Sequence, residues 1–269
     1  MGRSLTILAL GALALTAGCR VSRPDLQAGA GARDAGLAQG SEAGAVPPRS
    51  YVCRRASEPP ALEGSFEDGP WQQAPWTEDF VVVRRREPVG SVRTRAKMLW
   101  DDAYLYCVVE LLEPQQADAA SRPPRHDVDI LVADDAARPS YEIEVVGMGT
   151  IKDARFDGPE GARTSDLKWD AKGLKTSVQK SSDGATLRWT AGFALPWSTL
   201  VRQDAPQATP PSAPKPGAIW RVDMGRSTWR PVATEEEGLP QAAGYERAAW
   251  QPPADPAEPG GWGAVEFAP

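Results

Sequence analysis

Few side chains in this sequence could carry catalytic chemistry. Its 269 residues include one His, three Cys and 36 Asp and Glu, against 10 Trp, 5 Tyr and 5 Phe. A single histidine, His126, argues against a His-rich zinc site, and no G-x-S-x-G segment marks a serine nucleophile. A thiol nucleophile would have only His126 as its base. Sites built from carboxylates stay open, because Asp and Glu are abundant.

The tryptophans divide by their sequence surroundings. Five of them sit in apolar patterns and are predicted to pack in a core: Trp71, Trp100, Trp189, Trp197 and Trp220. Another four lie in or beside predicted loops: Trp169, Trp229, Trp250 and Trp262. For Trp229 and Trp250, stacking on a ligand and packing within a loop both stay open. We expect Trp262 to seal an edge before the last strand.

The sequence pattern predicts that strands carry these residues. Alternation of apolar and polar residues with period two runs through residues 91–98, 104–111, 128–132, 141–145, 187–195, 220–224 and 263–267. Asp101 and Asp102 mark a turn, and Pro196 ends a strand because it has no N–H to donate. No segment has the pattern of a four-turn amphipathic helix, and only a short helical turn is expected at residues 197–199. The sequence predicts an all-β fold, a two-sheet antiparallel β-sandwich.

Three connections between these strands are long: residues 113–125, 202–217 and 229–246. The sequence contains 26 Pro and 25 Gly, which is typical of a loop-rich β protein. Loops of this length in a small domain are usually functional or mobile.

The N-terminus has the features of a lipoprotein signal. Arg3 precedes an apolar run over residues 5–17, which is too short to span a bilayer. Residues 15–19, Leu-Thr-Ala-Gly-Cys, resemble a bacterial lipobox, in which Cys19 takes a lipid and becomes the first mature residue. We therefore expect a signal peptide over residues 1–18. The alternative is an ordinary cleaved signal with an incidental cysteine.

Residues 19–50 are rich in Ala and Gly and hold almost no large apolar side chain, so a flexible tether is expected there. The folded domain is predicted over residues 51–269. Arg20, rather than Asp, follows Cys19, which favours attachment to the outer membrane over the inner membrane. The expected location is the bacterial cell envelope.

Two cysteines remain once Cys19 is assigned to lipid. Cys53 lies just ahead of the predicted domain, and Cys107 lies in the strand over residues 104–111. In an oxidising compartment such a pair is compatible with a disulfide. Two separate thiols, with Cys107 buried, are the alternative.

The net charge of −6 argues against nucleic acid as a partner. The expected partners are a carbohydrate and, through the lipid, the membrane. No cofactor is required by any motif. A structural calcium ion stays open because related modules carry one, although Asp101 with Asp102 is more typical of a turn than of a metal site.

Several segments together resemble family 9 carbohydrate-binding modules, in an order and spacing that cover roughly residues 60–268. These segments are residues 62–71 with Ala74, 99–106, 127–132, 141–145, 192–197, 220–226, 249–250 and 262–263. The resemblance implies a two-sheet β-sandwich, in agreement with the alternation. It also implies that a glycan chain or chain end is bound, without cleavage, between aromatic walls.

The resemblance also implies site residues. Trp250 lies near one aromatic wall, whereas the place of the second wall reads Arg122-Pro123-Pro124, so that wall is missing or comes from another loop. Asp129 falls near the acid that accepts bonds from sugar hydroxyls, and Glu144 replaces a polar residue of the next strand. Arg226 matches a family arginine, which would contact the ligand or pair with a buried carboxylate such as Asp129. The predicted ligand-binding set is Trp250, Trp229, Asp129, Glu144, Arg226 and Trp169.

Other functions stay open at this stage. A glycoside hydrolase, or an accessory subunit of one, would need two carboxylates about 5 Å or 6.5–9.5 Å apart, and no motif marks such a pair. A haem-binding sandwich could use His126 with Met98, Met148 or Met224. A structural envelope protein would bind a partner and no small ligand.

Overall fold

The structure is a computed structural model that describes residues 48–83, 87–88, 92–115, 125–134, 139–158, 164–200, 213–230, 244–251 and 259–269. The predicted signal peptide, Cys19, the tether as far as residue 47 and the Arg122-Pro123-Pro124 segment lie outside these residues. The described residues belong to one unit, Val46–Pro269. Among them, no helix is long and apolar enough to cross a membrane.

Strands dominate the described residues, which contain no α-helix. The strands are β1 (Ser50–Arg55), β2 (Val81–Val82), β3 (Glu87–Pro88), β4 (Arg93–Trp100), β5 (Tyr104–Pro114), β6 (Arg125–Ala133), β7 (Ser140–Val146), β8 (Thr150–Asp157), β9 (Thr164–Asp166), β10 (Lys175–Ser182), β11 (Thr186–Pro196), β12 (Ile219–Arg230), β13 (Gly244–Ala249) and β14 (Gly263–Ala268). Three 3-10 turns complete them: η1 (Gly69–Gln73), η2 (Trp197–Thr199) and η3 (Pro259–Gly261). The predicted all-β class and the short helical turn at residues 197–199 are confirmed.

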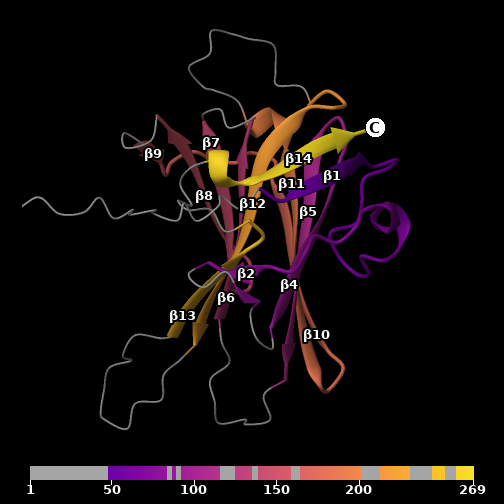
Figure 1. Ribbon diagram of the computed structural model, residues 1–269, viewed down its shortest axis with the longest axis vertical. Helices are drawn as coiled ribbons and strands as arrows, with labels where there is room; N and C mark the ends of the chain where they lie inside the picture. Colours follow the sequence, from indigo (N-terminus) through magenta and orange to yellow (C-terminus); the bar gives the residue numbers. More distant parts are fainter. Residues whose placement is uncertain are drawn as a thin grey trace, which may run out of the picture. The chain divides into compact units, whose positions relative to one another are not determined.

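Hydrogen bonds join the strands in one path, β10-β11-β5-β4-β1-β14-β12-β6-β7-β8-β9, with β13 beside β12. The path curls, so that two groups of strands face each other (Figure 1). We call β4, β5, β11 and β10 the β5 layer, and β13, β12, β6, β7 and β8 the β12 layer. Cys107 Sγ of β5 lies 3.5 Å from Met224 Sδ of β12, although these strands are not neighbours in the path. The predicted sandwich therefore forms from one curled sheet.

Strand β1 departs from the antiparallel prediction, because it pairs in parallel with both β14 and β4. The sequence analysis treats Cys53 as lying ahead of the first predicted strand, and this is wrong, because Cys53 lies on β1. Tyr51 and Cys53 are both buried and belong to the main core. A six-residue strand with only two inward apolar side chains gives a weak alternation signal, which explains why it was missed.

The core lies between the two layers and is lined by the inward side chains of each strand. On β5 these are Leu105, Cys107, Val109 and Leu111, which carry no exposed surface. The tryptophans predicted to pack are buried as expected, with only Trp220 retaining partial exposure: Trp71, Trp100, Trp189, Trp197 and Trp220. Trp262 is buried in a separate small cluster with Leu131 and Ala133.

Cys53 and Cys107 are free thiols with no exposed surface, so the disulfide that the sequence left open is not formed. Strand β4 lies between β1 and β5. Two strand spacings amount to about 9–10 Å, whereas a disulfide needs Cα atoms about 4.4–6.8 Å apart. Burial also raises the pKa of both thiols, which keeps them protonated.

Strands β8, β10 and β13 were not predicted. The edge strand β10 has the sequence Lys-Thr-Ser-Val-Gln-Lys-Ser-Ser, in which Val178 is the only large apolar residue. Strand β13 and the end of β12 occupy both ends of the segment predicted as a loop over residues 229–246. This prediction is therefore wrong at its two ends, and the correction places Trp229 on a strand.

Candidate ligand-binding surface

The predicted ligand-binding residues lie on opposite faces of the β12 layer. Successive side chains of a strand point to opposite faces, and the register of β12 with β6 and β13 fixes which residues share a face. Trp229 and Asp129 point outward, together with Glu144, which pairs with Asp129 across β6 and β7. Trp250 and Arg226 point into the sandwich. The structure therefore does not bring the predicted set together at one site.

Trp250 is part of the core and cannot form an aromatic wall. Its ring has no exposed surface and packs edge-on against Tyr51, with centroids 6.4 Å apart and planes at 89°. The indole Nε1 donates a hydrogen bond to Glu78 Oε2 at 3.0 Å. A Cβ at Gly263 would lie 2.3 Å from the ring. Of the two interpretations left open for Trp250, packing is correct.

Trp169 is also a core residue, with 4% of its surface exposed. Its ring lies against Tyr141, with centroids 5.0 Å apart. A loop position in the sequence indicated an accessible ring, but the chain after β9 turns the side chain inward, where aromatic contact favours it. Trp169 is removed from the ligand-binding set.

Arg226 is completely buried and serves the fold. Its guanidinium donates to Thr94 Oγ1 of β4 at 2.9 Å and to Glu246 Oε1 of β13 at 3.0 Å. The structural role weighed from the sequence is therefore correct, but the proposed partner Asp129 is wrong. Arg226 instead connects the β12 layer to the β5 layer across the interior.

Asp129 is held by a different arginine, Arg247 of β13. The two form a bidentate pair, with distances of 2.7 and 2.8 Å. To reach β6, the Arg247 side chain passes over β12 at Gly225, where a Cβ would lie 2.5 Å from Arg247 Nη2 and 2.7 Å from Asp129 Oδ1. The outward face at Gly225 is thus filled by this ion pair. Asp129 is 3% exposed, so a sugar would have to displace Arg247 to reach its carboxylate.

Glu144 lies next to Asp129 at the rim of the same face. Its carboxylate accepts a bond from Lys152 Nζ at 3.0 Å, and 26% of its side chain is exposed. Glu144 therefore remains accessible to a ligand. Such a ligand would displace Lys152 from Glu144, and this surface ion pair contributes little to stability.

Asp223 is a further acid of this region that the sequence did not single out. It is 1% exposed and accepts a bond from the Gln251 backbone N–H at 2.9 Å. Burial raises the pKa of Asp223 to about 8, and the negative charge of Asp129 adds to the rise, while Arg247 opposes it. Asp223 is therefore protonated in the folded protein at neutral pH.

Two exposed rings lie at the far end of the same face. Trp229 of β12 and Tyr245 of β13 are cross-strand partners, 38% and 50% exposed, with centroids 4.6 Å apart and planes at 47°. We call these two residues the aromatic pair. Large exposed rings side by side are uncommon on a soluble surface unless they bind something. The other large apolar side chains exposed on the described residues are Val52, Met148, Leu167 and Ile219.

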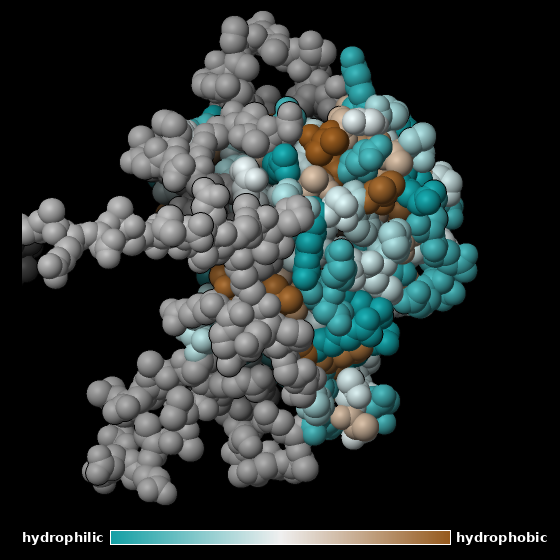
Figure 2. Space-filling view, viewed as in Figure 1, coloured by the Kyte–Doolittle hydropathy of each residue, from teal (hydrophilic) through white to brown (hydrophobic). Residues whose placement is uncertain are grey.

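Two side chains of β6 fix the orientation of the Trp229 ring. Its Nε1 donates to Asp127 Oδ2 at 3.2 Å, and the Arg125 guanidinium lies 5.4 Å from its ring centroid. Asp127 is itself held by Arg125 at 3.0 Å and by the Gly147 backbone N–H at 3.0 Å. A ring held in this way loses little conformational freedom when a ligand stacks on it. Most of the described surface visible in Figure 2 is hydrophilic, with a few separate apolar spots.

The sequence identified Trp229 but missed its neighbours Tyr245, Asp127 and Arg125. Tyr245 lies in the segment predicted as loop, and a cross-strand partner shows no signal in a single strand's alternation. Asp127 and Arg125 lie at the start of β6, where the alternation did mark Asp127 as outward. Recognition of β13 as a strand would have paired Tyr245 with Trp229.

A metal or haem site finds no support among the described side chains. Within the described ranges, no three His, Cys, Asp or Glu side chains gather closely enough to hold a metal ion. The Asp101 carboxylate accepts bonds from the backbone N–H groups of Ala103 and Tyr104, which confirms the predicted turn. Both ring nitrogens of His126 lie 3.1 Å from oxygen partners, Thr228 Oγ1 and Glu113 Oε1.

No protein-family model matches this sequence, and no curated protein matches it. Similar solved structures include a family 9 carbohydrate-binding module from Caldicellulosiruptor kristjanssonii in complex with cellotriose. The two sequences are 13% identical, the match covers 82% of this chain and 94% of that one, and the TM-score is 0.48. A family 9 module from the same organism in complex with glucose is 14% identical over 80% of this chain and 95% of that one, with a TM-score of 0.45. A candidate carbohydrate-binding protein from Bacteroides uniformis is 12% identical over 82% of this chain and 99% of that one, with a TM-score of 0.49. Cellotriose and glucose are ligands of those modules.

Proposed function

We propose that this protein is a non-catalytic carbohydrate-binding module held at the cell envelope by a lipid on Cys19, and that the aromatic pair binds a glycan chain or chain end. The observation that carries the proposal is the exposed, oriented Trp229 ring beside Tyr245. The other tryptophans of the predicted site are in the core, so the proposal moves the contact from Trp250 to Trp229.

The chemistry of a sugar suits this surface. One face of a pyranose ring presents C–H groups that pack on an indole, and its rim presents hydroxyls that need donors and acceptors. Around the aromatic pair these are the Arg125 guanidinium, whose side chain is 55% exposed, and the Tyr245 hydroxyl, which lies 3.2 Å from Ser227 Oγ. Because the two rings are tilted by 47°, one sugar ring can stack on Trp229 while Tyr245 contacts its edge.

Calorimetric titration with soluble oligosaccharides tests the proposal. We expect a panel of gluco-, xylo- and manno-oligosaccharides to include a ligand. Trp229→Ala should weaken its binding at least tenfold, and Tyr245→Ala several-fold. Leu167→Ala is the matched control, since Leu167 is 74% exposed and lies outside the pair. Absence of binding to every saccharide by the folded protein, or equal affinity for the Trp229 variant, would refute the proposal.

The lipid anchor rests on the sequence of residues 1–19 and is proposed on that basis. The apolar run with Ala-Gly-Cys at its end supports lipidation of Cys19. The Ala- and Gly-rich residues that follow would give the tether a reach of roughly 30 Å. Expression in bacteria with a labelled fatty acid should label the wild-type chain and leave Cys19→Ser unlabelled, while Cys53→Ser keeps the label. A label that persists in Cys19→Ser would contradict the anchor.

A further inference from the structure

A second polar surface lies on the outward face of the β5 layer, away from the aromatic pair. Residues 56–76 run over one part of this face, where Phe66 and Trp71 pack on outward side chains of β4, β5 and β11. Gly192 of β11 permits the close approach, because a Cβ there would lie 2.8 Å from the Leu62 carbonyl oxygen. Next to this covering segment, the face carries charged side chains instead of apolar ones.

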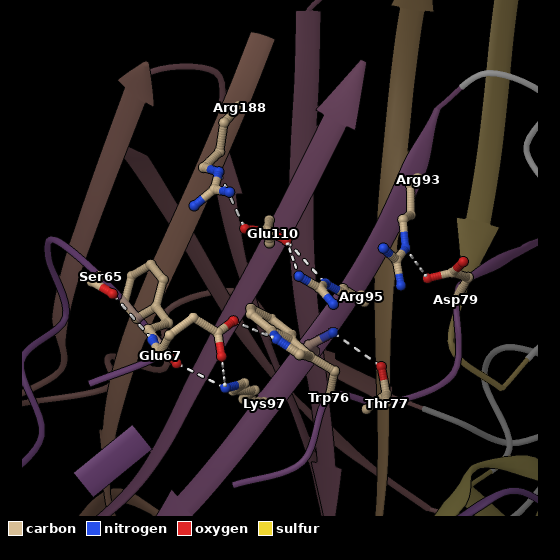
Figure 3. A network of polar contacts seen from close by, with 12 residues as sticks. Ser65, Glu67, Trp76, Thr77, Asp79, Arg93, Arg95, Lys97, Glu110 and Arg188 are labelled. Atoms are coloured by element: carbon tan, nitrogen blue, oxygen red, sulfur yellow. Dashed lines mark hydrogen bonds and ion pairs between the residues drawn. The ribbon is translucent and has the colours of Figure 1, made fainter. Parts of the chain in front are cut away.

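Trp76 stands at the border between the covering segment and the charged face. Its Nε1 donates to Glu67 Oε1 at 2.8 Å, and two cations of β4 lie against its ring, as Figure 3 shows. The Arg95 guanidinium is 4.0 Å and the Lys97 ammonium 4.6 Å from the ring centroid. Trp76 remains partly exposed and packs only at the margin of the cluster beneath it. Its position is thus fixed by polar contacts and not by burial.

The neighbouring strands continue this charged face. Glu110 of β5 is 2% exposed and lies between Arg95 of β4, at 2.8 Å, and Arg188 of β11, at 3.3 Å. Arg188 is 50% exposed and contacts Glu110 through Nε at the edge of this face (Figure 3). An exposed guanidinium is well suited to a carboxylate ligand, because its donors form a planar fork.

The charge balance of this face differs from that of the whole chain. Four cations, namely Arg93, Arg95, Lys97 and Arg188, contact three carboxylates, those of Glu67, Asp79 and Glu110. Asp183, which lies beside Arg188, adds a fourth carboxylate, so these charges balance, whereas the whole chain carries −6. In an acidic protein, a patch without net negative charge is a place where an anion can approach.

A cavity of about 350 Å³ adjoins Arg188. It is lined by Leu112, Ser181, Ser182, Asp183, Thr186 and Arg188. The serine and threonine hydroxyls can donate or accept hydrogen bonds. The backbone N–H groups of Ala185 and Thr186 both donate to Asp183 Oδ1, at 2.9 and 2.7 Å, which lowers the pKa of this carboxyl. Arg188 is the cation that lines this cavity.

We propose that this face is a second glycan-binding surface, and that it takes an acidic polysaccharide of uronic acid residues. The sugar carboxylate binds Arg188 beside the cavity, the hydroxyls contact the serines, and the chain runs over Glu110 and Arg95 toward the Trp76 ring. The surface shares no residue with the aromatic pair. Failure of one site therefore leaves the other untouched.

Binding of a galacturonic acid tetrasaccharide, compared with a neutral galactose tetrasaccharide, tests this assignment. We expect the acidic sugar to bind, its affinity to fall as salt rises, and Arg188→Ala to weaken it at least tenfold. Arg188→Lys should give an intermediate loss, because the charge remains but the fork is lost. Lys180→Ala is the matched control, since Lys180 is an exposed cation of β10 whose position in the strand alternates with that of Ser181. Trp229→Ala should leave this binding unchanged.

A variant that should bind the acidic tetrasaccharide more tightly gives a stricter test than one that should bind it less. Glu110→Gln removes the carboxylate that partly neutralises Arg95 and Arg188, so binding of the acidic tetrasaccharide should tighten several-fold, which a purely structural role would not produce. Unchanged affinity in both the Arg188→Ala and Glu110→Gln proteins would overturn the proposal. So would equal binding of the neutral tetrasaccharide, or no binding of the acidic one.

Discussion

The two sides of the β12–β13 hairpin use the same residue types for opposite purposes. On the inward side, Arg226 and Trp250 have no exposed surface and connect strands across the core. On the outward side, Trp229 and Arg247 lie at or near the surface, where Arg247 binds Asp129 and Trp229 is exposed beside Tyr245. An indole and a guanidinium therefore become structural or accessible according to their position in the strand.

The difference follows from the period of the strand. A shift of one residue in register would exchange the two faces, moving every side chain of the hairpin to the other side. The Asp129–Arg247 pair and the glycine beneath it hold the outward register, and the Trp250 ring holds the inward one. Four predictions test this difference between the two faces.

The largest effect is expected from the inward side. Trp250→Ala leaves a cavity in the core and an unpaired Glu78, so the free energy of unfolding should fall by about 3–5 kcal/mol. Trp229→Ala, on the outward side, should lower it by only about 1 kcal/mol, through the lost bond to Asp127 and the lost contact with Tyr245. Urea unfolding followed by circular dichroism measures both. Similar losses in the two variants would contradict the inward and outward assignment.

A smaller loss of stability is expected from a substitution at Gly225, where the Asp129–Arg247 ion pair crosses β12. In Gly225→Ala the new Cβ would overlap Arg247 and Asp129, and the displacement should lower the free energy of unfolding by about 1–3 kcal/mol. Gly260→Ala is the matched control, because a Cβ there meets no atom within 4 Å. Equal stability of the two variants would show that Arg247 does not pass over Gly225.

The pH dependence of stability should reveal Asp223. Its pKa is about 8 in the folded state and about 3.9 in an unfolded chain, so the folded state binds the extra proton between these values. Stability should therefore be highest at the acidic end of this window. It should then fall as pH rises toward 8, by up to about 1.4 kcal/mol per pH unit. Asp223→Asn should reduce the change of stability with pH, measured by thermal melts between pH 5 and 8. If the change stays the same in this variant, other groups cause the pH dependence.

The smallest effect on stability is expected at the Lys152–Glu144 ion pair. Lys152→Ala removes an ion pair with Glu144 in which the lysine side chain is 63% exposed, so unfolding should change by less than about 0.5 kcal/mol. The same substitution should leave saccharide binding at the aromatic pair intact. A loss above 1.5 kcal/mol, measured by the same urea titration, would mean that the outward face is more closely packed than its exposure indicates.

Prediction from sequence succeeded where one strand carries a strong alternation of its own. Strands β4, β5, β6, β7, β11 and β14 all show buried faces in the sequence, and the turn at Asp101 follows from its side-chain bonds to the backbone. The polar strands β10 and β13 carry no such signal, because β10 has one large apolar residue and each is placed by its pairing, β10 with β11 and β13 with β12. Prediction of Trp250 as accessible failed for the same reason: a chain position after an unrecognised strand gives no information on which face its ring occupies.

The site was predicted only in part, for a related reason. Trp229 was named from its position near a loop, but its partners come from β6 and β13, which are 102 and 16 residues away as counted from Asp127 and Tyr245. Asp129 was expected to meet a sugar, whereas Arg247 from β13 occupies it. Such cross-strand contacts depend on register, and a single sequence does not specify which strands are neighbours.

The central claim concerns which indole meets the sugar, and a saccharide titration followed by the indole N–H resonances of the folded protein tests it most directly. Trp229→Phe assigns the Trp229 signal, and Trp250→Phe assigns that of Trp250. With an oligosaccharide found by calorimetry, the Trp229 resonance should shift with ligand concentration while those of Trp250 and Trp169 stay in place. A shift at Trp250 with none at Trp229 would contradict the account.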